Sequence, residues 1–139
     1  FRNPILIERG CSTRAITATS IAHNTAEIET FIREALRQRF NSDATPIPNF
    51  LDAEEIAARD REQKELISRG MSQSILVRGI KIDGNKISVD ADRLIAVAQI
   101  RSAFIFPLVV NIATTMRTEN NPYGLQAIKI EQPKSEAKP

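Results

Sequence analysis

Several residue types that usually carry chemistry are scarce in this 139-residue chain. The single cysteine, Cys11, excludes a disulfide within the chain and any metal site with several thiolate ligands. The single histidine, His23, has no cysteine or serine motif to activate, and neither a phosphate-binding glycine loop nor a nucleophile elbow occurs. Tryptophan is absent, and the six phenylalanines fall at core-like positions, which does not make a base-stacking surface. We therefore expect no catalytic residue, no metal site and no cofactor.

Charge and hydropathy exclude two further classes. The chain has 19 basic and 17 acidic residues, and a formal charge of +2 is too small to steer the protein to nucleic acid. The longest apolar run, AFIFPLVV at 103–110, is far shorter than the ~20 residues of a membrane-spanning helix. The chain begins at Phe1 and not at methionine, so we expect that an upstream segment, such as a signal peptide or membrane anchor, has been removed.

The first half of the chain predicts an arm and two helices. Residues 1–22 have no helical period and read as an extended arm or membrane-proximal linker. A helix is expected from Asn24 to Phe40, with Asn24 as its cap and one apolar face. A second helix is expected from Asp52 to Gly70; its middle is almost wholly charged, so it should be peripheral and anchored by apolar residues only (Ile56, Ala57, Leu66 and Ile67).

The second half predicts strands. We expect strands at 74–82 and 86–99 joined by an Asp83-Gly84 hairpin turn, with a bulge or a change of burial near Asp92-Arg93. Arg101-Ser102 is expected to form the next turn, leading into a long central strand at 103–113 that is covered on both faces. A last strand is expected at 125–131, and residues 132–139 read as a disordered tail.

These elements predict one α+β domain over residues 23–131. Two helices precede three to four antiparallel strands, so the helices should pack on a curved antiparallel sheet. A chain of this length buries roughly 68–70% of its unfolded surface, which is enough for a core without disulfides or metals.

Three charged groups could carry chemistry, and each has a plainer interpretation. Asp90 and Asp92 share one strand face and could hold a cation, but a hard cation needs more than two carboxylates. Glu54 and Glu55 diverge around a helix, which argues against a general acid and base pair. The arginines of the first helix could bind phosphate, but an ordinary solvated helix face is the favoured interpretation (Arg33, Arg37 and Arg39).

The loop before the last strand is the candidate site. Asn121 precedes Pro122, which fixes its own φ, and Gly124 permits a positive φ. Such a loop is ordered at little entropic cost, and we expect Tyr123 at its tip to offer an apolar ring and a hydroxyl to a partner. The candidate partner-binding or structural residues are Asn121, Pro122, Tyr123, Gly124 and Leu125.

This loop carries a resemblance to a known family. Arg117-Thr118 followed by Asn121-Pro122-Tyr123-Gly124 and a closing strand resembles the periplasmic domain of the eighth VirB component of type IV secretion systems, a group that includes the TraE and TrbF conjugation proteins. That family has an Asn-Pro-x-Gly motif ahead of its last strand. Leu125 departs from the family pattern, in which a larger aromatic residue is common.

The resemblance implies a fold, a location and a role. The fold would be cystatin-like, akin to nuclear transport factor two, on the periplasmic face of the bacterial inner membrane, with a membrane anchor before Phe1. The role would be that of a non-enzymatic assembly factor that contacts itself and other inner-membrane and core-complex subunits, with no dedicated nucleic-acid site. The alternatives are a small-molecule-binding protein or enzyme on the same cone-shaped fold, which needs polar residues pointing into a cavity, and a DNA-contacting module that uses the arginines of the first helix.

Overall fold

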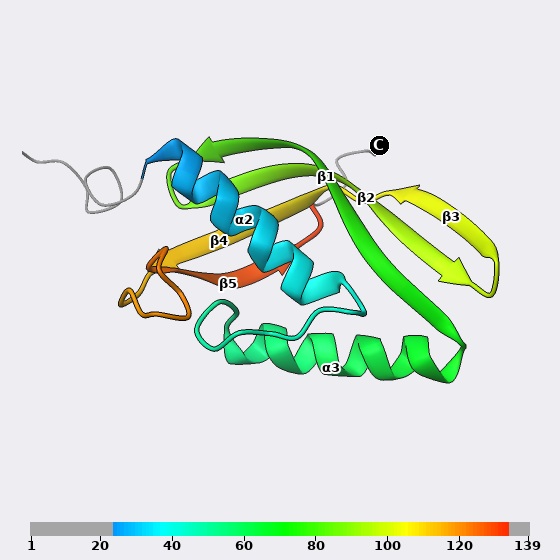
Figure 1. Cartoon of the computed structure of the whole chain (residues 1–139). Coiled ribbons are helices and arrows are strands. Elements are labelled where there is room, and N and C mark those ends of the chain that lie inside the picture. The colour runs from blue at the N-terminus through cyan, green and yellow to red at the C-terminus, as the bar shows by residue number, and fades with distance from the viewer. Residues whose placement is uncertain (1–23, 134–139) are drawn as a thin grey trace, which may run out of the picture.

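The computed structural model describes residues 24–133, and it has two helices followed by five strands. The expected arm at 1–22, Cys11, His23 and most of the expected tail lie outside the described residues. The elements are α2 (Thr25–Phe40), α3 (Ala53–Ser68), β1 (Met71–Asp83), β2 (Lys86–Val97), β3 (Ile100–Ile105), β4 (Leu108–Thr114) and β5 (Leu125–Glu131), as Figure 1 shows.

Both expected helices are confirmed, and each begins at the cap that the sequence predicts. The Asn24 side chain accepts a hydrogen bond from the Glu27 N–H at 2.7 Å, and that of Asp52 accepts one from the Glu54 N–H at 3.1 Å. These bonds satisfy amide groups that have no partner inside the helix. α3 is followed by Gly70 at φ +67°, a left-handed residue that ends the helix as glycine usually does.

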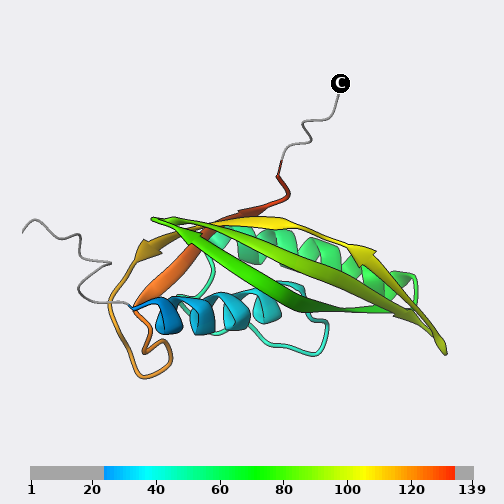
Figure 2. The same ribbon diagram turned by 90° about the horizontal axis from the view of Figure 1, so that it is seen from above.

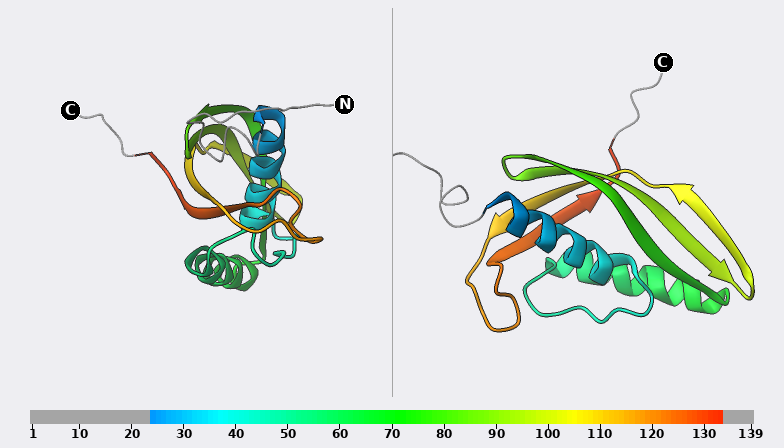
Figure 3. Two further views of the ribbon diagram at one scale, coloured as in Figure 1. Left: turned by 90° about the vertical axis from the view of Figure 1, so that its left-hand side faces the viewer. Right: turned by 45° about the horizontal axis from the view of Figure 1, so that its top comes forward.

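The strands form one antiparallel sheet with the order β1-β2-β4-β5, and β3 pairs with the far half of β2. The sheet curves around α2, and α3 lies along it beneath β1 and β5 (Figures 1 and 3). The expected α+β fold, with helices packed on a curved antiparallel sheet, is therefore confirmed.

The long strand expected at 103–113 is broken in two. β3 pairs with residues 92–97 of β2 and β4 pairs with residues 86–89, so both halves run beside the same strand. The break falls at Phe106-Pro107, because proline has no N–H to give to a sheet ladder. The expected cover on both faces is also wrong, since Ile105 is 78% exposed.

The turn before this strand lies three residues earlier than expected. Ala98 and Gln99 form it, with Ala98 at φ +56°, whereas Arg101 and Ser102 lie inside β3. The expected change of burial near Asp92 is confirmed, because β2 alternates buried and exposed residues up to Ala91 and is partly buried on both faces beyond it. The register irregularity lies on the partner strand, between Val77 and Gly79.

The core fills the space between α2 and the sheet. It holds sixteen buried apolar residues, six of which come from α2 (Ile28, Phe31, Ile32, Ala35, Leu36 and Phe40). The central strands β2 and β4 contribute Ile87 and Val110, and β5 contributes Leu125, each with no exposed surface. Because these side chains occupy the interface of helix and sheet, the interior of the fold is a packed core.

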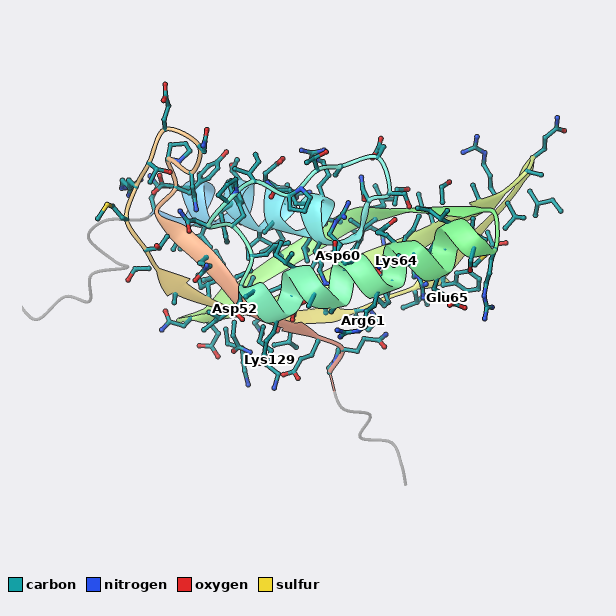
Figure 4. The ribbon with its side chains drawn as sticks, turned by 90° about the horizontal axis from the view of Figure 1, so that it is seen from below. Asp52, Asp60, Arg61, Lys64, Glu65 and Lys129 are labelled. Carbon is teal, nitrogen blue, oxygen red and sulfur yellow. The ribbon has the colours of Figure 1, made fainter. Side chains whose placement is uncertain are left out.

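The charged middle of α3 packs inward, which corrects the expectation that only apolar residues anchor it. Arg59 and Gln63 are buried with Leu66, whereas Ile67 is 73% exposed and Ala57 is exposed. Arg59 donates to the carbonyl oxygens of Gln38, at 2.6 Å, and of Asn41 and Ala44, beyond the end of α2. The guanidinium group thus satisfies backbone oxygens that the helix end leaves without partners. Figure 4 shows the opposite face of α3, with Asp60, Arg61, Lys64 and Glu65.

Candidate functional site

The loop between β4 and β5 is closed by its own backbone. The Thr115 N–H donates to the Gly124 carbonyl at 2.9 Å, and the Thr118 N–H donates to the Asn121 carbonyl at 3.0 Å. The Thr118 hydroxyl oxygen in turn accepts from the Asn121 N–H at 3.0 Å. Gly124 has φ +65°, the left-handed conformation that its position in the loop predicted. The loop therefore has a defined backbone conformation. It lies at the end of the sheet near the start of α2 (Figures 1 and 2).

Asn121 ties this loop to a second loop of the chain. Its side chain is fully buried, and its Nδ2 donates to the carbonyl oxygens of Asn49 and Leu125, both at 2.9 Å. Asn49 itself has φ +72°, so the segment before α3 is held in an uncommon backbone conformation at this contact. The position of Asn121 is thus that of an internal brace between residues far apart in the sequence.

Tyr123 does not lie at the tip of the loop, which corrects the expectation for its ring. It is partly buried, and its ring meets the edges or faces of Phe31 and Phe50 with centroids 6.0 Å away in each case. Leu125 is fully buried and belongs to the core. Aromatic pairs at this separation add stabilisation beyond their buried area, so these two residues fasten the loop to the domain.

The outward face of the loop consists of other residues. Met116, Arg117, Glu119, Asn120 and Pro122 are exposed, and Met116 is 78% exposed. Arg117 donates to Glu27 of α2 at 2.9 Å and to the carbonyl of Pro122 at 2.6 Å, so this face is braced against the helix. The hydrogen bond to Glu27 raises the pKa of the Arg117 guanidinium group, which stays charged.

Substituting Gly124 by valine should strain this loop. A β-branched residue at φ +65° is held in a backbone conformation that its side chain disfavours, at a cost of about 1–3 kcal/mol. We expect the urea unfolding midpoint to fall accordingly, without a change of slope. Gly124→Asn is the matched control, because asparagine tolerates the left-handed region, and it should lose much less. Equal losses for the two variants would contradict the assignment of strain.

Two of the other charged candidates, Asp92 and Glu55, pair with arginines of the domain. Asp92 pairs with Arg78 at 3.3 Å, and Asp90, on the same face, is exposed. No group of three or more histidine, cysteine, aspartate or glutamate side chains that could hold a metal occurs among residues 24–133. Glu55 is one partner of a buried ion pair, and its other carboxylate oxygen accepts from the Ile130 N–H at 3.0 Å.

Arg33 and Arg37 of α2 are exposed, as the favoured solvated face predicts, but Arg39 is not. Arg39 is buried and pairs with Glu55 at 2.8 Å and Glu62 at 3.0 Å. Arg37 pairs with Glu34 on the surface, and this hydrogen bond lowers the pKa of the Glu34 carboxyl group despite its partial burial. Arg33 donates to the Val77 carbonyl at 3.4 Å. Each guanidinium group thus has an acceptor within the domain, which leaves little of a phosphate-binding patch.

The hollows on the surface of residues 24–133 include two that lie beside the sheet. One, of about 510 Å³, is lined by residues 72–74 of β1, 94–96 of β2 and 101–103 of β3, together with Ser42 and Asp43. The other, of about 450 Å³, includes Asp90 together with Pro107 and Pro133. Neither is the polar cavity between sheet and helices that an enzyme or small-molecule protein of this fold would use, because apolar side chains fill that space.

The fold of this chain matches that of solved protein structures. A TraE protein in complex with 2-(2-furyl)isonicotinic acid superposes with a TM-score of 0.63 and 6% sequence identity, covering 78% of this chain and 96% of TraE. The soluble domain of TrwG from the type IV secretion machinery of Bartonella grahamii gives a TM-score of 0.56 and 11% identity, covering 84% and 99%. The chain shares its fold with TraE and TrwG.

Further comparisons agree with this result or find nothing. TraE in complex with 4-(1H-pyrrol-1-yl)pyridine-2-carboxylic acid gives a TM-score of 0.54 and 6% identity, covering 82% of this chain and 100% of TraE. No family model and no curated protein matches the sequence. Neither of the two described helices has the length and hydropathy to cross a membrane.

Two features of the fold were not predicted from the sequence. The buried polar stripe of α3 could have been found, because Ile56, Arg59, Gln63 and Leu66 follow one another at helical spacing. The β2–β3 hairpin could not, because Ala98-Gln99 carries no glycine, asparagine or aspartate to indicate a tight turn. This hairpin extends from the domain at the end opposite the β4–β5 loop (Figure 1).

Proposed function

We propose that this chain is a non-enzymatic assembly component of a bacterial type IV secretion system, acting through protein contacts at the periplasmic face of the inner membrane. The observation that carries the proposal is the shared fold, which covers 96–100% of the TraE and TrwG chains. The Asn-Pro-Tyr-Gly loop ahead of the last strand and the packed apolar core add support. The partners are further copies of the chain and other subunits of the inner-membrane and core complexes.

Within this role, the β4–β5 loop divides into a bracing part and a contact part. Asn121, Tyr123, Gly124 and Leu125 point inward and set the shape of the loop. Pro122 and the exposed residues around it form the outward surface, which we define as the loop face (Met116, Glu119, Asn120 and Pro122). The loop face is the surface through which other subunits bind.

The test is complementation of conjugative transfer in a host that carries the system and lacks this gene. The full-length protein should restore transfer, whereas Met116→Lys combined with Asn120→Lys should lower it by about tenfold or more, because two buried ammonium groups oppose docking. A matched control places two lysines on α3 in the same way, at Ala57 and Ile67, which are neutral and exposed. Unchanged transfer when the gene is absent would remove the secretion role. Full activity of the loop-face variant, at normal protein levels, would remove the loop face as the contact surface.

A further inference from the structure

The sheet has three edges, and other segments of the chain bond parts of two of them. Along β1, the Ser42 N–H donates to the Gln73 carbonyl at 2.8 Å, the Ser42 hydroxyl oxygen accepts from the Gln73 N–H at 2.9 Å, and Asn41 Oδ1 accepts from the Ile75 N–H at 2.9 Å. Along β5, the Ala127 N–H donates to Phe50 and the Ala127 carbonyl accepts from Asp52, at 2.8 and 2.9 Å. The third edge is β3.

The backbone of β3 points outward at its odd-numbered residues. The Phe106 N–H donates to the Ala91 carbonyl at 2.9 Å, which fixes the phase of the ladder. In an antiparallel pair, residues that bond the neighbouring strand alternate with residues whose groups point away. Arg101, Ala103 and Ile105 are therefore turned from β2, and their backbone groups bond no other element in the part of the chain that the structure describes.

Of the devices that usually protect an edge strand, β3 has its short length and one charged residue, Arg101, and lacks the others. All six residues of β3 are exposed, and between Ile100 and Ile105 there is no proline, no lysine and no register shift. Apolar side chains lie on both faces of the strand: Ile100 and Phe104 are 70% and 53% exposed on one, and Ile105 is 78% exposed on the other. An exposed edge with apolar side chains on both faces is a template for an added strand.

We propose that the free edge of β3 pairs with β3 of a second copy of this chain, antiparallel, about a two-fold axis at Ser102. In such a pair, a residue whose backbone groups point outward must lie opposite another residue of this kind. These residues are odd-numbered in both copies, so the numbers of two opposed residues add to an even sum. The register centred on Ser102 pairs Ile100 to Phe104 with the same five residues of the second copy.

This register is also self-complementary. It sets Ala103 opposite Arg101 of the second copy in hydrogen-bonded pairs, and Phe104 opposite Ile100 of the second copy in closely spaced pairs. Aromatic and β-branched side chains stabilise each other across such pairs, and the symmetry supplies this contact twice. The Ser102 side chains of the two copies lie opposite each other at the two-fold axis. The inference deepens the proposed assembly role by naming a self-association surface, but it rests on the sheet geometry.

Sedimentation of the 139-residue chain tests the pairing, at concentrations up to about 100 µM, where micromolar dimers are well populated. Ala103→Pro removes an outward N–H that β2 does not use, and Ile100→Lys places a charge against Phe104 of the second copy. We expect each to weaken self-association by about tenfold or more, which corresponds to about 1.4 kcal/mol. Ile67→Lys is the matched control, because Ile67 is about as exposed as Ile100, at 73% against 70%, but lies on α3, and it should leave the dimer unchanged.

Cysteine crosslinking tests the register. In a Cys11→Ser background, Ser102→Cys should form a disulfide-linked dimer, because directly opposed residues in a closely spaced pair have Cα atoms ≈ 4.5 Å apart. Ser88→Cys, which is exposed on β2, should not. A chain that stays monomeric, as it would if the edge served a strand of another protein, overturns the proposal, as does a dimer that ignores both β3 substitutions or fails to crosslink at residue 102. None of these assays involves secretion, so they can fail while the transfer test succeeds, and the reverse.

Discussion

Replacing Arg39 by methionine is expected to lower the free energy of unfolding by about 3–5 kcal/mol, the usual cost of removing one partner from a buried ion pair. The Arg39 side chain is 11% exposed, and its guanidinium group joins Glu55 and Glu62 of α3 to the last turn of α2 while lying 4.6 Å from the centre of the Phe40 ring. Without it, the Glu55 carboxylate, 12% exposed, has no cation. Methionine retains much of the apolar stem, so the loss reports on the charge.

The same helix offers the control for this change. Arg37 also pairs with a carboxylate, that of Glu34, but its side chain is 47% exposed. Exposed pairs contribute under about 1 kcal/mol, so Arg37→Met should have a small effect. Urea denaturation of both variants measures the difference. Adding Glu55→Gln to Arg39→Met should recover part of the loss, because glutamine can still accept from the Ile130 N–H. Similar losses for the two arginine variants would show that the buried pair contributes no more than a surface pair.

The polar contacts around Arg39 also explain where sequence patterns succeed and fail for the fold. The limits of both helices follow from local chemistry, namely the caps at Asn24 and Asp52 and the left-handed Gly70. The inward face of α3 depends instead on distant groups: the carbonyl oxygens at the end of α2 accept from Arg59, and that of Phe40 accepts from Gln63 at 3.1 Å. From sequence alone, a charged residue is expected to be exposed to solvent. Its burial can be predicted only when the hydrogen-bond acceptors that pair with it in the folded structure are known.

A similar distinction applies to the strands and to the candidate loop. Apolar alternation from Phe104 to Ile112 predicts strand correctly, but it cannot show that Pro107 interrupts the pairing or that β3 projects past the core. For the loop, the positive φ of Gly124 follows from residue type. The inward direction of Asn121 and Tyr123 does not, because it is set by Asn49, Phe31 and Phe50, which are distant in sequence.

Replacing Asn121 by aspartate is expected to lower the free energy of unfolding by about 3 kcal/mol or more at pH 7, since a buried charge without a partner is costly. The Asn121 side chain is fully buried, and two carbonyl oxygens lie 2.9 Å from its Nδ2, which identifies that atom as the donor. An aspartate oxygen at this place would face those oxygens with a negative charge. Shape and volume are almost unchanged, so the loss reports on the hydrogen bonds that hold the loop to the domain.

The pH dependence of this variant separates a buried carboxylate from a simple packing defect. Burial and the two carbonyl oxygens favour the protonated acid, so the pKa of the new carboxyl group in the folded state should lie above its unfolded value of about 3.9. The folded protein then binds more protons, and stability must fall as pH rises from the unfolded to the folded pKa. Relative to the unsubstituted protein, the deficit should be smallest near pH 3 and largest above the folded pKa. Asn120→Asp, an exposed neighbour with the same chemical change, should stay within about 0.5 kcal/mol throughout, whereas a deficit at residue 121 that is independent of pH would show that the side chain escapes to solvent.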